Sequence, residues 1–401
     1  MSKEDNRLIL ITNPGSSSRK YALYKGSEVV CTLHFEYEGE KVICTLKKAD
    51  GSKKVLKQPF KELTSTVANL ERILTEEGIL GGMTKLDAIL ARIVAPGTYF
   101  TQDHLVDDEC LKQLEIAKKR APLHVPVVAG EIEHLVKSFK GTPVIAISDS
   151  EFHDARPDLT KYYAIDTEVA DKADVKRFGF HGLSVGSVVR YMKSQDILPQ
   201  KLIVCHLGSG SSVTSVFEGK SLDTTMGYTP LQGLMMATRC GDMDVAAAIR
   251  LKHYLGYESD ESLEKYLNKQ AGLLGVSGKT DDMREILKLR DEGDKRGTFA
   301  HAMFVYKVQA LIGEMAASLG GVDALVFTAT IGERSDEIRR TVTQKLSYLG
   351  FALDDAKNVG EMPERHTNIA ADGSKPVYVI RTDEADEMIR QASLILDEMK
   401  K

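Results

Sequence analysis

Two segments of the chain, offset by 193 residues, follow the same pattern. The first contains an apolar run at 8–11, the loop Asn-Pro-Gly-Ser-Ser-Ser at 13–18 and a glycine turn at 25–27. The second contains an apolar run at 202–204, the loop His-Leu-Gly-Ser-Gly-Ser-Ser at 206–212 and a glycine turn at 218–220. In each, a strand enters a Gly/Ser loop, returns as a second strand and turns again at a glycine. An internal repeat at this spacing predicts a duplicated domain.

Helical and strand patterns alternate around these segments. Apolar residues recur at helical spacing within 61–77, and further helices are expected at about 107–119, 126–139, 184–194 and 298–319. Apolar runs at 86–94, 144–147 and 324–327 predict strands. Strand hairpins followed by alternating helix and strand are typical of an α/β fold with mixed sheets. A length of 401 residues predicts two domains, or three, and the expected boundary is a loop at 151–161 around Pro157.

Charge and cysteine content narrow the class of function. The net charge is −5, so no overall basic field is available to bind nucleic acid or anionic lipid. No apolar run approaches the length of a membrane span. We therefore expect no nucleic-acid partner and no membrane association. The five cysteines never occur in C-x-x-C spacing, which indicates a reducing compartment, and we expect a cytoplasmic protein.

The two Gly/Ser loops are candidate phosphate sites. A strand that ends in small residues lets backbone N–H groups converge on an anion, and the hydroxyls of Ser16, Ser18 and Ser211 add further donors. Lys20 follows the first loop closely enough to reach the same anion. Either loop alone is better explained as a plain turn, because Gly and Ser are common turn residues. The repetition of one loop in both halves favours phosphate binding.

Polar residues stand where several strands or apolar runs end, a usual position for catalytic groups in α/β sheets. They are Arg92, His124, Asp149, His181 and Arg239. Each alone is consistent with a structural role, such as an ion pair or a helix cap. Together, two arginines and two histidines suit an anionic phosphoryl group, and Asp149, Glu384 and Asn13 suit a hydrated magnesium ion. No zinc-type His/Cys cluster is present.

Longer motifs link these residues to a known family. They include N-P-G-S-S-S-R-K-Y at 13–21, A-P-L-H at 121–124, F-G-F-H-G-L-S at 178–184, H-L-G-S-G-S-S at 206–212, D-T-T-M-G-Y-T-P-L-Q-G-L at 223–234 and A-T-R-C-G-D-M-D at 237–244. With these motifs the chain resembles the acetate and propionate kinase family, which belongs to the actin, hexokinase and Hsp70 phosphotransferase superfamily. The resemblance runs from about Leu8 to the C-terminal helix.

The resemblance implies a fold and a reaction. The fold would be two duplicated ribonuclease H-like (actin-like ATPase) domains with a central cleft: 1–152, joined by a C-terminal helix at about 386–401, and 153–385. The reaction would be reversible, direct in-line transfer of the γ-phosphoryl group of ATP to acetate, giving acetyl phosphate and ADP. Mg²⁺, or Mn²⁺ in its place, would be the cofactor. The family also implies a homodimer.

The resemblance also assigns residues. The catalytic residues would be Arg92, His124, Asp149, His181 and Arg239, with Arg92 also binding acetate. The methyl group of acetate would lie among Val94, Leu123, Phe180 and Pro230, and valine at 94 favours acetate over propionate. The metal residues would be Asn13 and Glu384. The donor phosphates and nucleoside would be held by Lys20, Ser16, Ser18, His206, Leu207, Gly208, Ser209, Gly210, Asp282, Met283, Arg284, Thr330, Ile331, Gly332, Glu333 and Arg334.

The sequence departs from the family pattern mainly on the donor side. Ser209 replaces an asparagine, Thr330 replaces a glycine and Arg334 replaces an asparagine. A β-branched threonine narrows a nucleoside slot, and an arginine suits a more anionic donor. Three alternatives therefore stand beside an ATP-dependent acetate kinase: a kinase for propionate, one that uses pyrophosphate or another nucleotide, and a nucleotide-binding sensor or scaffold without activity. The last is disfavoured, because the chain retains Arg92, Asp149, His181, Arg239 and Glu384.

Overall fold

The chain folds into two compact units. The computed structural model describes residues 6–14, 18–58, 60–81, 85–123, 125–360 and 364–399. Unit 1 consists of residues 1–149 and 384–401, and unit 2 consists of residues 150–383. The change of unit falls between Asp149 and Ser150, just before the stretch 151–161.

Unit 1 is built on one eight-stranded mixed sheet in the order β5-β4-β3-β2-β1-β6-β8-β7. Strands β1 to β5 form an antiparallel meander, whereas β1, β6 and β8 run parallel. The strands are β1 (Leu8–Pro14), β2 (Ser18–Lys25), β3 (Glu28–Glu38), β4 (Lys41–Lys48), β5 (Lys53–Lys57), β6 (Ala88–Ile93), β7 (His104–Leu105) and β8 (Val144–Ser148).

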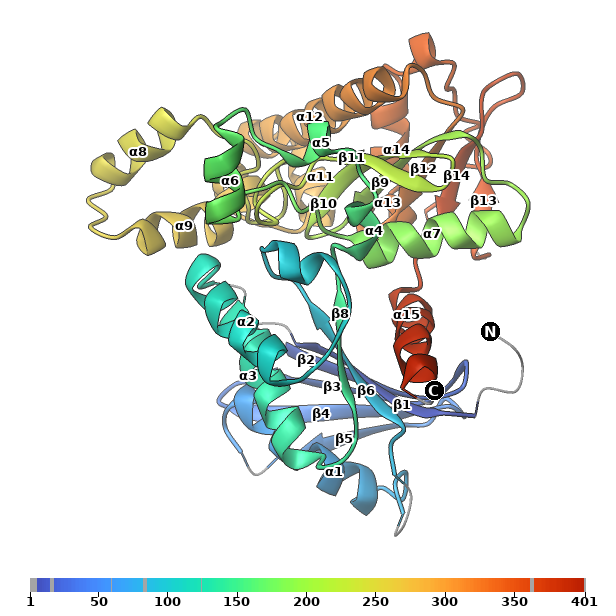
Figure 1. The fold of residues 1–401 in the computed structure, drawn as a ribbon. Coiled ribbons are helices and arrows are strands. Elements are labelled where there is room, and N and C mark those ends of the chain that lie inside the picture. The colour runs from blue at the N-terminus through green and yellow to red at the C-terminus, as the bar shows by residue number, and fades with distance from the viewer. Residues whose placement is uncertain are drawn as a thin grey trace. The chain divides into compact units, whose positions relative to one another are not determined.

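Helices cover both faces of this sheet (Figure 1). Ile89, Ala91 and Ile93 alternate along β6 and join a core with α1 (Thr66–Glu76), α2 (Asp108–Arg120) and α3 (Val125–Ser138). Leu90 points to the opposite face, where α15 (Glu384–Glu398) packs against β6 and β8. Two 3-10 turns, η1 (Leu63–Ser65) and η2 (Thr98–Thr101), complete unit 1. The C-terminal helix therefore belongs to the unit that begins the chain.

Unit 2 is built on a six-stranded mixed sheet in the order β11-β10-β9-β12-β14-β13. Its strands are β9 (Lys201–Leu207), β10 (Ser211–Phe217), β11 (Lys220–Thr224), β12 (Ala324–Thr328), β13 (His366–Asn368) and β14 (Val377–Ile380). Its helices are α4 (Glu151–Asp154), α5 (Asp158–Lys161), α6 (Thr167–Ala173), α7 (Gly182–Ser194), α8 (Val245–Tyr254), α9 (Asp260–Lys269), α10 (Gly272–Ser277), α11 (Met283–Asp291), α12 (Lys295–Leu319), α13 (Ala329–Arg334), α14 (Asp336–Thr343) and the 3-10 turn η3 (Ser347–Leu349).

Side-chain alternation along β9 divides the core of unit 2. Ile203 and Cys205 join the apolar cluster that includes α12, whereas Leu202 and Val204 join the cluster that includes α7. The long helix α12 begins where Asp294 accepts a hydrogen bond from the Gly297 N–H, and it ends at Gly320, which has a left-handed φ of 62°. This capped helix packs against β9, β10 and β11.

The predicted duplication is confirmed by the strand order. The series β3-β2-β1-β6-β8 of unit 1 and the series β11-β10-β9-β12-β14 of unit 2 have the same order and the same directions. Both hairpins turn at a left-handed glycine, Gly26 (φ 59°) and Gly219 (φ 79°). The copies differ at the Gly/Ser loop: the last paired residues are Pro14 and Arg19 in unit 1, but Leu207 and Ser211 in unit 2, so the second loop is one residue shorter.

One local expectation is wrong. The stretch 151–161 is not a loop, because it forms the short helices α4 and α5 on either side of Pro157. Pro157 is the residue before α5, and its missing N–H costs nothing at a helix start. Among the residues that the structure describes, no helix is both long enough and apolar enough to cross a membrane.

Candidate active site

Three predicted residues meet at one edge of the sheet of unit 1. Strands β6 and β8 are parallel neighbours, and Arg92 lies near the end of β6 while Asp149 directly follows β8. Glu384 is the first residue of α15, which packs against both strands. Arg92 Nη2 lies 3.0 Å from Asp149 Oδ1, and Arg92 Nη1 lies 3.3 Å from Glu384 Oε2. We call Arg92, Asp149 and Glu384 the acid site.

The acid site is an electrostatically coupled group. The side chain of Asp149 is 1% exposed and that of Arg92 is 16% exposed. Burial acts to lower the pKa of Arg92, but the carboxylates of Asp149 and Glu384 outweigh it and the net shift is upward. Burial and the charge of Asp149 raise the pKa of Glu384, and Arg92 opposes that rise. One guanidinium therefore lies between two carboxylates, whose charges raise its pKa.

Two histidines form a stacked pair in unit 2. The rings of His181 and His206 lie 3.9 Å apart with an interplanar angle of 22°. His181 Nδ1 lies 3.0 Å from Ser212 Oγ, and His206 Nδ1 lies 2.8 Å from Ser184 Oγ. Each Nδ1 atom is thus anchored by a serine hydroxyl, which orients the imidazole ring. Neither serine is among the predicted site residues, although both lie within the motifs at 178–184 and 206–212.

The second Gly/Ser loop allows these side chains to approach its backbone. A Cβ atom at Gly210 would lie 3.1 Å from His181 Nε2 and 3.4 Å from Arg239 Nη1. A side chain at this position would therefore fill the space before His181 and Arg239. Arg239 is half-buried, and its Nη1 atom donates to the carbonyl of Pro230 at 3.3 Å. The predicted residues His181, His206, Gly210 and Arg239 thus form one cluster in unit 2.

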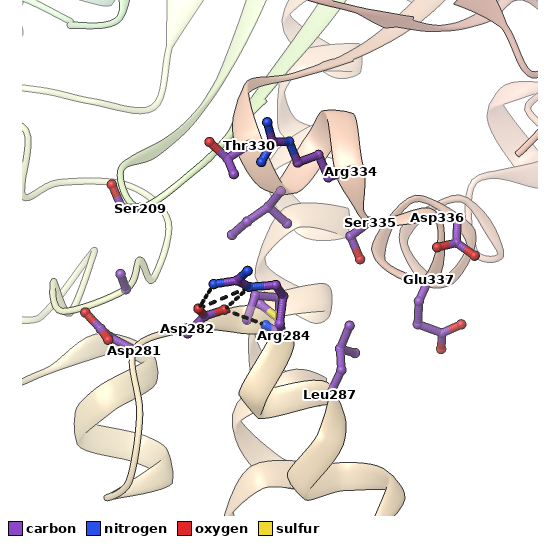
Figure 2. Close-up of a pocket in the computed structure, with 13 residues that line it drawn as sticks. Ser209, Asp281, Asp282, Arg284, Leu287, Thr330, Arg334, Ser335, Asp336 and Glu337 are labelled. Carbon is purple, nitrogen blue, oxygen red and sulfur yellow. Dashed lines mark hydrogen bonds and ion pairs between the residues drawn. The ribbon is translucent and has the colours of Figure 1, made fainter. Parts of the chain in front are cut away.

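A pocket of about 610 Å³ lies beside this cluster, wholly within unit 2 (Figure 2). It is large enough for a nucleoside. The predicted residues that line it are Ser209, Asp282, Met283, Arg284, Thr330, Ile331 and Arg334. Lining residues that sequence reasoning missed are Ala237, Asp281, Leu287, Ser335, Asp336 and Glu337. Ser335 to Glu337 directly follow a predicted residue, but no motif distinguishes them.

The arginines of the pocket differ in their partners. Arg284 Nε donates to Asp282 Oδ1 at 3.1 Å, as Figure 2 shows, and Asp282 also caps α11 by accepting from the Arg284 N–H. Arg334 is exposed at the end of α13, and no ion pair to it is found among the described residues. Of these two guanidinium groups, that of Arg334 is the one whose charge is not already balanced by an acid.

Helix α13 is held in place by buried groups. Arg339, which is fully buried, donates through Nη1 to the carbonyls of Gly332 (2.8 Å) and Glu333 (2.9 Å). The carboxylate of Glu333 accepts from the Ala329 N–H at 2.9 Å, so its side chain closes the helix start and does not line the pocket. Ala329 has a left-handed φ of 64°, which is strained for a residue with a Cβ atom. No sequence pattern distinguishes Ala329 or Arg339 as important for this helix.

The other predicted residues are distributed over both units. Asn13 and Lys20 are exposed and paired across β1 and β2, and Ser18 begins β2. Leu207 and Gly208 are buried at the end of β9. Ser16 and His124 lie outside the described residues. Of the predicted methyl pocket, Val94 and Leu123 are half-buried in unit 1, whereas Phe180 and Pro230 are buried in unit 2, so the pocket stays a prediction.

Two copies of one five-strand core are the architecture of phosphotransferases with actin-like ATPase topology. The family is narrower than this class. The model of the Acetokinase family matches residues 8–391, and the chain belongs to this family of kinases that act on a carboxylate.

Individual relatives agree with this membership. The chain is 37% identical over 384 residues to an acetate kinase of Clostridium botulinum (strain Okra / Type B1), which covers 94% of this chain and 96% of that protein. A propionate kinase structure from Francisella tularensis has a TM-score of 0.87 at 33% identity and covers 96% of this chain and 98% of its own. An acetate kinase structure from Porphyromonas gingivalis has a TM-score of 0.85 at 30% identity, with coverages of 97% and 99%.

Proposed function

We propose that this chain transfers the γ-phosphoryl group of ATP to acetate, reversibly, giving acetyl phosphate and ADP. The observation that carries the proposal is the acid site, Arg92 between Asp149 and Glu384, in a chain that the family model covers from residue 8 to 391. A pocket of about 610 Å³ supports a nucleoside-bearing donor over pyrophosphate alone, because pyrophosphate lacks a group to fill it.

The reaction requires no general base. Acetate has a pKa below 5 and is ionised at neutral pH, so its carboxylate oxygen attacks the γ-phosphorus directly. A new O–P bond forms as the bond between phosphorus and the β–γ bridging oxygen breaks, and ADP leaves with that electron pair. The main barrier is the approach of a negative nucleophile to a negative phosphate.

The residues of both units suit the task of lowering that barrier. We assign Arg92 to the acetate carboxylate, and Arg239 and His181 to the oxygens of the transferring phosphoryl group. Preorganised cationic and N–H donors of this kind stabilise the charge that develops in the transition state. His206, anchored by Ser184, is assigned to the donor phosphates together with the loop 208–210. We assign the nucleoside to the pocket of Figure 2.

The donor set of the acid site fits a divalent cation. Asp149 and Glu384 supply carboxylate oxygens, the ligand atoms that Mg²⁺ prefers. Mg²⁺ is held in proteins by one or two carboxylates with several waters, so the small number of protein ligands is sufficient. When bound, Mg²⁺ or Mn²⁺ neutralises charge on the donor phosphates. Asn13, on β1, is the further oxygen ligand that we assign.

A hydroxamate assay for acyl phosphate tests the proposal. Wild-type protein is incubated with acetate or propionate and with ATP or pyrophosphate, in the presence of Mg²⁺. We expect product with acetate and ATP. Product with propionate in excess of acetate would support the alternative carboxylate, which the similarity to a propionate kinase structure favours. Product with pyrophosphate alone would overturn the nucleotide donor, and no product from any pair would favour a sensor or scaffold. The homodimer and the cytoplasmic location stay predictions.

A further inference from the structure

The segment that leads into His181 is held by side chains from one short stretch of unit 2. Ser150 Oγ donates to the carbonyl of Gly179 at 2.6 Å, and His153 Nε2 lies 2.9 Å from the carbonyl of Phe180. Arg156, which follows α4, donates through Nη2 to the carbonyls of Phe178 (2.8 Å) and Arg177. Four consecutive carbonyls, 177–180, therefore accept hydrogen bonds from side chains of residues 150–156.

The donors in this arrangement are almost completely buried. Ser150 is 2% exposed, His153 is 0% exposed and Arg156 is 3% exposed. A buried hydrogen bond fixes the position of both partners, because losing it leaves a polar group without water. Together with Gly227, whose carbonyl accepts from the Phe178 and Gly179 N–H groups, these donors fix the backbone before His181.

His153 touches this segment in one defined protonation state. A carbonyl oxygen only accepts hydrogen bonds, so Nε2 carries the hydrogen that is donated to Phe180. The Nδ1 atom lies 2.8 Å from Ser221 Oγ and accepts from its hydroxyl. Burial lowers the pKa of His153 to about 3, which keeps the ring neutral and in this tautomer at neutral pH. The ring therefore links β11 to the residue before His181.

The backbone at 179–181 needs such support. Gly179 has a φ of 78°, and a Cβ atom there would lie 2.6 Å from Thr224 Cγ2 and 3.1 Å from the His153 ring. His181 has a φ of 62° and a ψ of 21°, a left-handed conformation that costs a residue with a Cβ atom about 1 to 2 kcal/mol. Strained backbone of this kind persists only where the surroundings determine it. Here the hydrogen bonds from the side chains of residues 150–156 hold this backbone in its strained conformation.

We propose that His153 is a positioning residue for the phosphoryl transfer: through the Phe180 carbonyl it sets the backbone that places the His181 ring before Gly210. The proposal rests on the proposed function only for its kinetic test. His153 does not line the pocket, and it acts through His181. The two hydrogen bonds of the His153 ring can be compared directly. The one to the Phe180 carbonyl leads toward His181, and the one to Ser221 lies on the other side of the ring.

Two substitutions separate these hydrogen bonds. The amide of His153→Gln reaches the place of Nε2 and keeps the donor to Phe180, whereas the amide of His153→Asn reaches only the place of Nδ1, beside Ser221. Ser221→Ala is the matched control, since it removes a buried hydrogen bond from the same ring on the other side. We expect His153→Asn to lower kcat about 10- to 100-fold, as displacement of a reacting group does. The kcat of His153→Gln and of Ser221→Ala should stay within about threefold of wild type. The KM for ATP should change little in these two variants and in His153→Asn.

A double substitution distinguishes positioning from general destabilisation. In a His181→Ala background, the change His153→Asn should have no further effect on kcat, because the group that it positions is already absent. Equal losses in the wild-type and His181→Ala backgrounds would overturn the proposal. A kcat of His153→Asn equal to that of Ser221→Ala would also overturn it.

A spectroscopic comparison keeps the test independent of the reaction. The imidazole resonances of His181, followed in protein with ¹⁵N-labelled histidine, should shift in His153→Asn and stay near the wild-type position in His153→Gln and Ser221→Ala. Absence of a shift in His153→Asn would overturn the positioning role. If wild-type protein forms no acetyl phosphate, the proposed function fails while this comparison still decides the role of His153.

Discussion

The guanidinium of Arg92 contacts two carboxylates and, in the proposed function, binds acetate, so its loss should affect both stability and activity. Arg92→Ala should lower kcat at least about 100-fold, as loss of a strong electrostatic donor does. It should also destabilise unit 1, since Asp149 stays buried without its cation. Steady-state kinetics and urea unfolding measure the two effects.

Arg239→Ala is the informative companion to that substitution. It should lower kcat by a similar factor, because Arg239 is assigned to the oxygens of the transferring phosphoryl group. Near-normal turnover in either variant would contradict the assignment of the arginines. Arg92→Lys, which keeps the charge but loses the planar fork, should fall between wild type and Arg92→Ala.

The buried His153 makes a pH prediction with a definite sign. Burial, assisted by the charge of Arg156, lowers its pKa from 6.5 to about 3. Between these values the unfolded chain binds a proton that the folded protein does not, so the stability contributed by the neutral ring is complete above about pH 6.5 and is lost as the pH falls toward 3. Wild type should lose about 2 kcal/mol more unfolding free energy than His153→Gln between pH 7.5 and pH 5. Urea unfolding at both pH values measures this, and parallel losses would contradict it.

At the scale of residues, the sequence predicts which polar groups come together better than it predicts which residues hold them in position. The positions of Arg92 and Asp149 are predictable because each residue lies where a strand ends, and the strand pattern of the sequence shows those ends. The two strands are parallel neighbours in the sheet. Ser184, Ser212 and His153 are not, because their importance arises from which ring nitrogen or carbonyl they reach in three dimensions. A serine in a helix or a histidine near a charged run has no pattern that reveals such a partner.

At the scale of elements, α13 connects the core strand β12 with the pocket to which we assign the nucleoside. Its end carries Arg334, whereas Arg284 on α11 faces the same pocket but is paired with Asp282. Arg334→Ala should therefore raise the KM for ATP about 3- to 10-fold with kcat within about twofold, because an unbalanced cation attracts the anionic donor. The effect should shrink at high salt.

Arg284→Ala is the control for this prediction, because its charge is already offset by Asp282. It should change the KM for ATP less than Arg334→Ala does. A larger effect at 284 than at 334 would contradict the assignment, and an unchanged KM in both variants would mean that neither cation meets the donor.

Element prediction failed where elements are short. Helices α2, α3 and α12 are long, periodic and therefore predictable, and their predicted bounds lie within a few residues of the observed ones. Helices α4 and α5 have four residues each, too few for a periodic pattern to appear, and the charged stretch around Pro157 reads as a loop. Their stability comes from tertiary contacts such as those of His153 and Arg156.

At the scale of the whole molecule, duplication is the feature that the sequence predicts most securely. The same hairpin spacing occurs twice in the sequence, and each hairpin belongs to a sheet with the same order of five strands. The specialisation of the copies is harder to predict, because it depends on insertions. Unit 2 adds α8 to α11 between β11 and the long helix α12, and the pocket is lined by residues of α11, α13 and α14 that have no counterpart in the repeated segments.

This difference between the units predicts which peptides are protected from hydrogen exchange when a nucleotide binds without a metal ion. The pocket lies wholly in unit 2, so ADP without a divalent cation should slow amide hydrogen exchange in peptides covering 281–287 and 330–337. Peptides covering β6 and the start of α15, which carry Arg92 and Glu384, should exchange at the rate of the free protein. Hydrogen exchange followed by mass spectrometry measures both, with pyrophosphate as the control that should not protect 281–287. Protection of β6 by ADP alone, or equal protection of 281–287 by pyrophosphate, would show that the donor is not held by the unit 2 pocket.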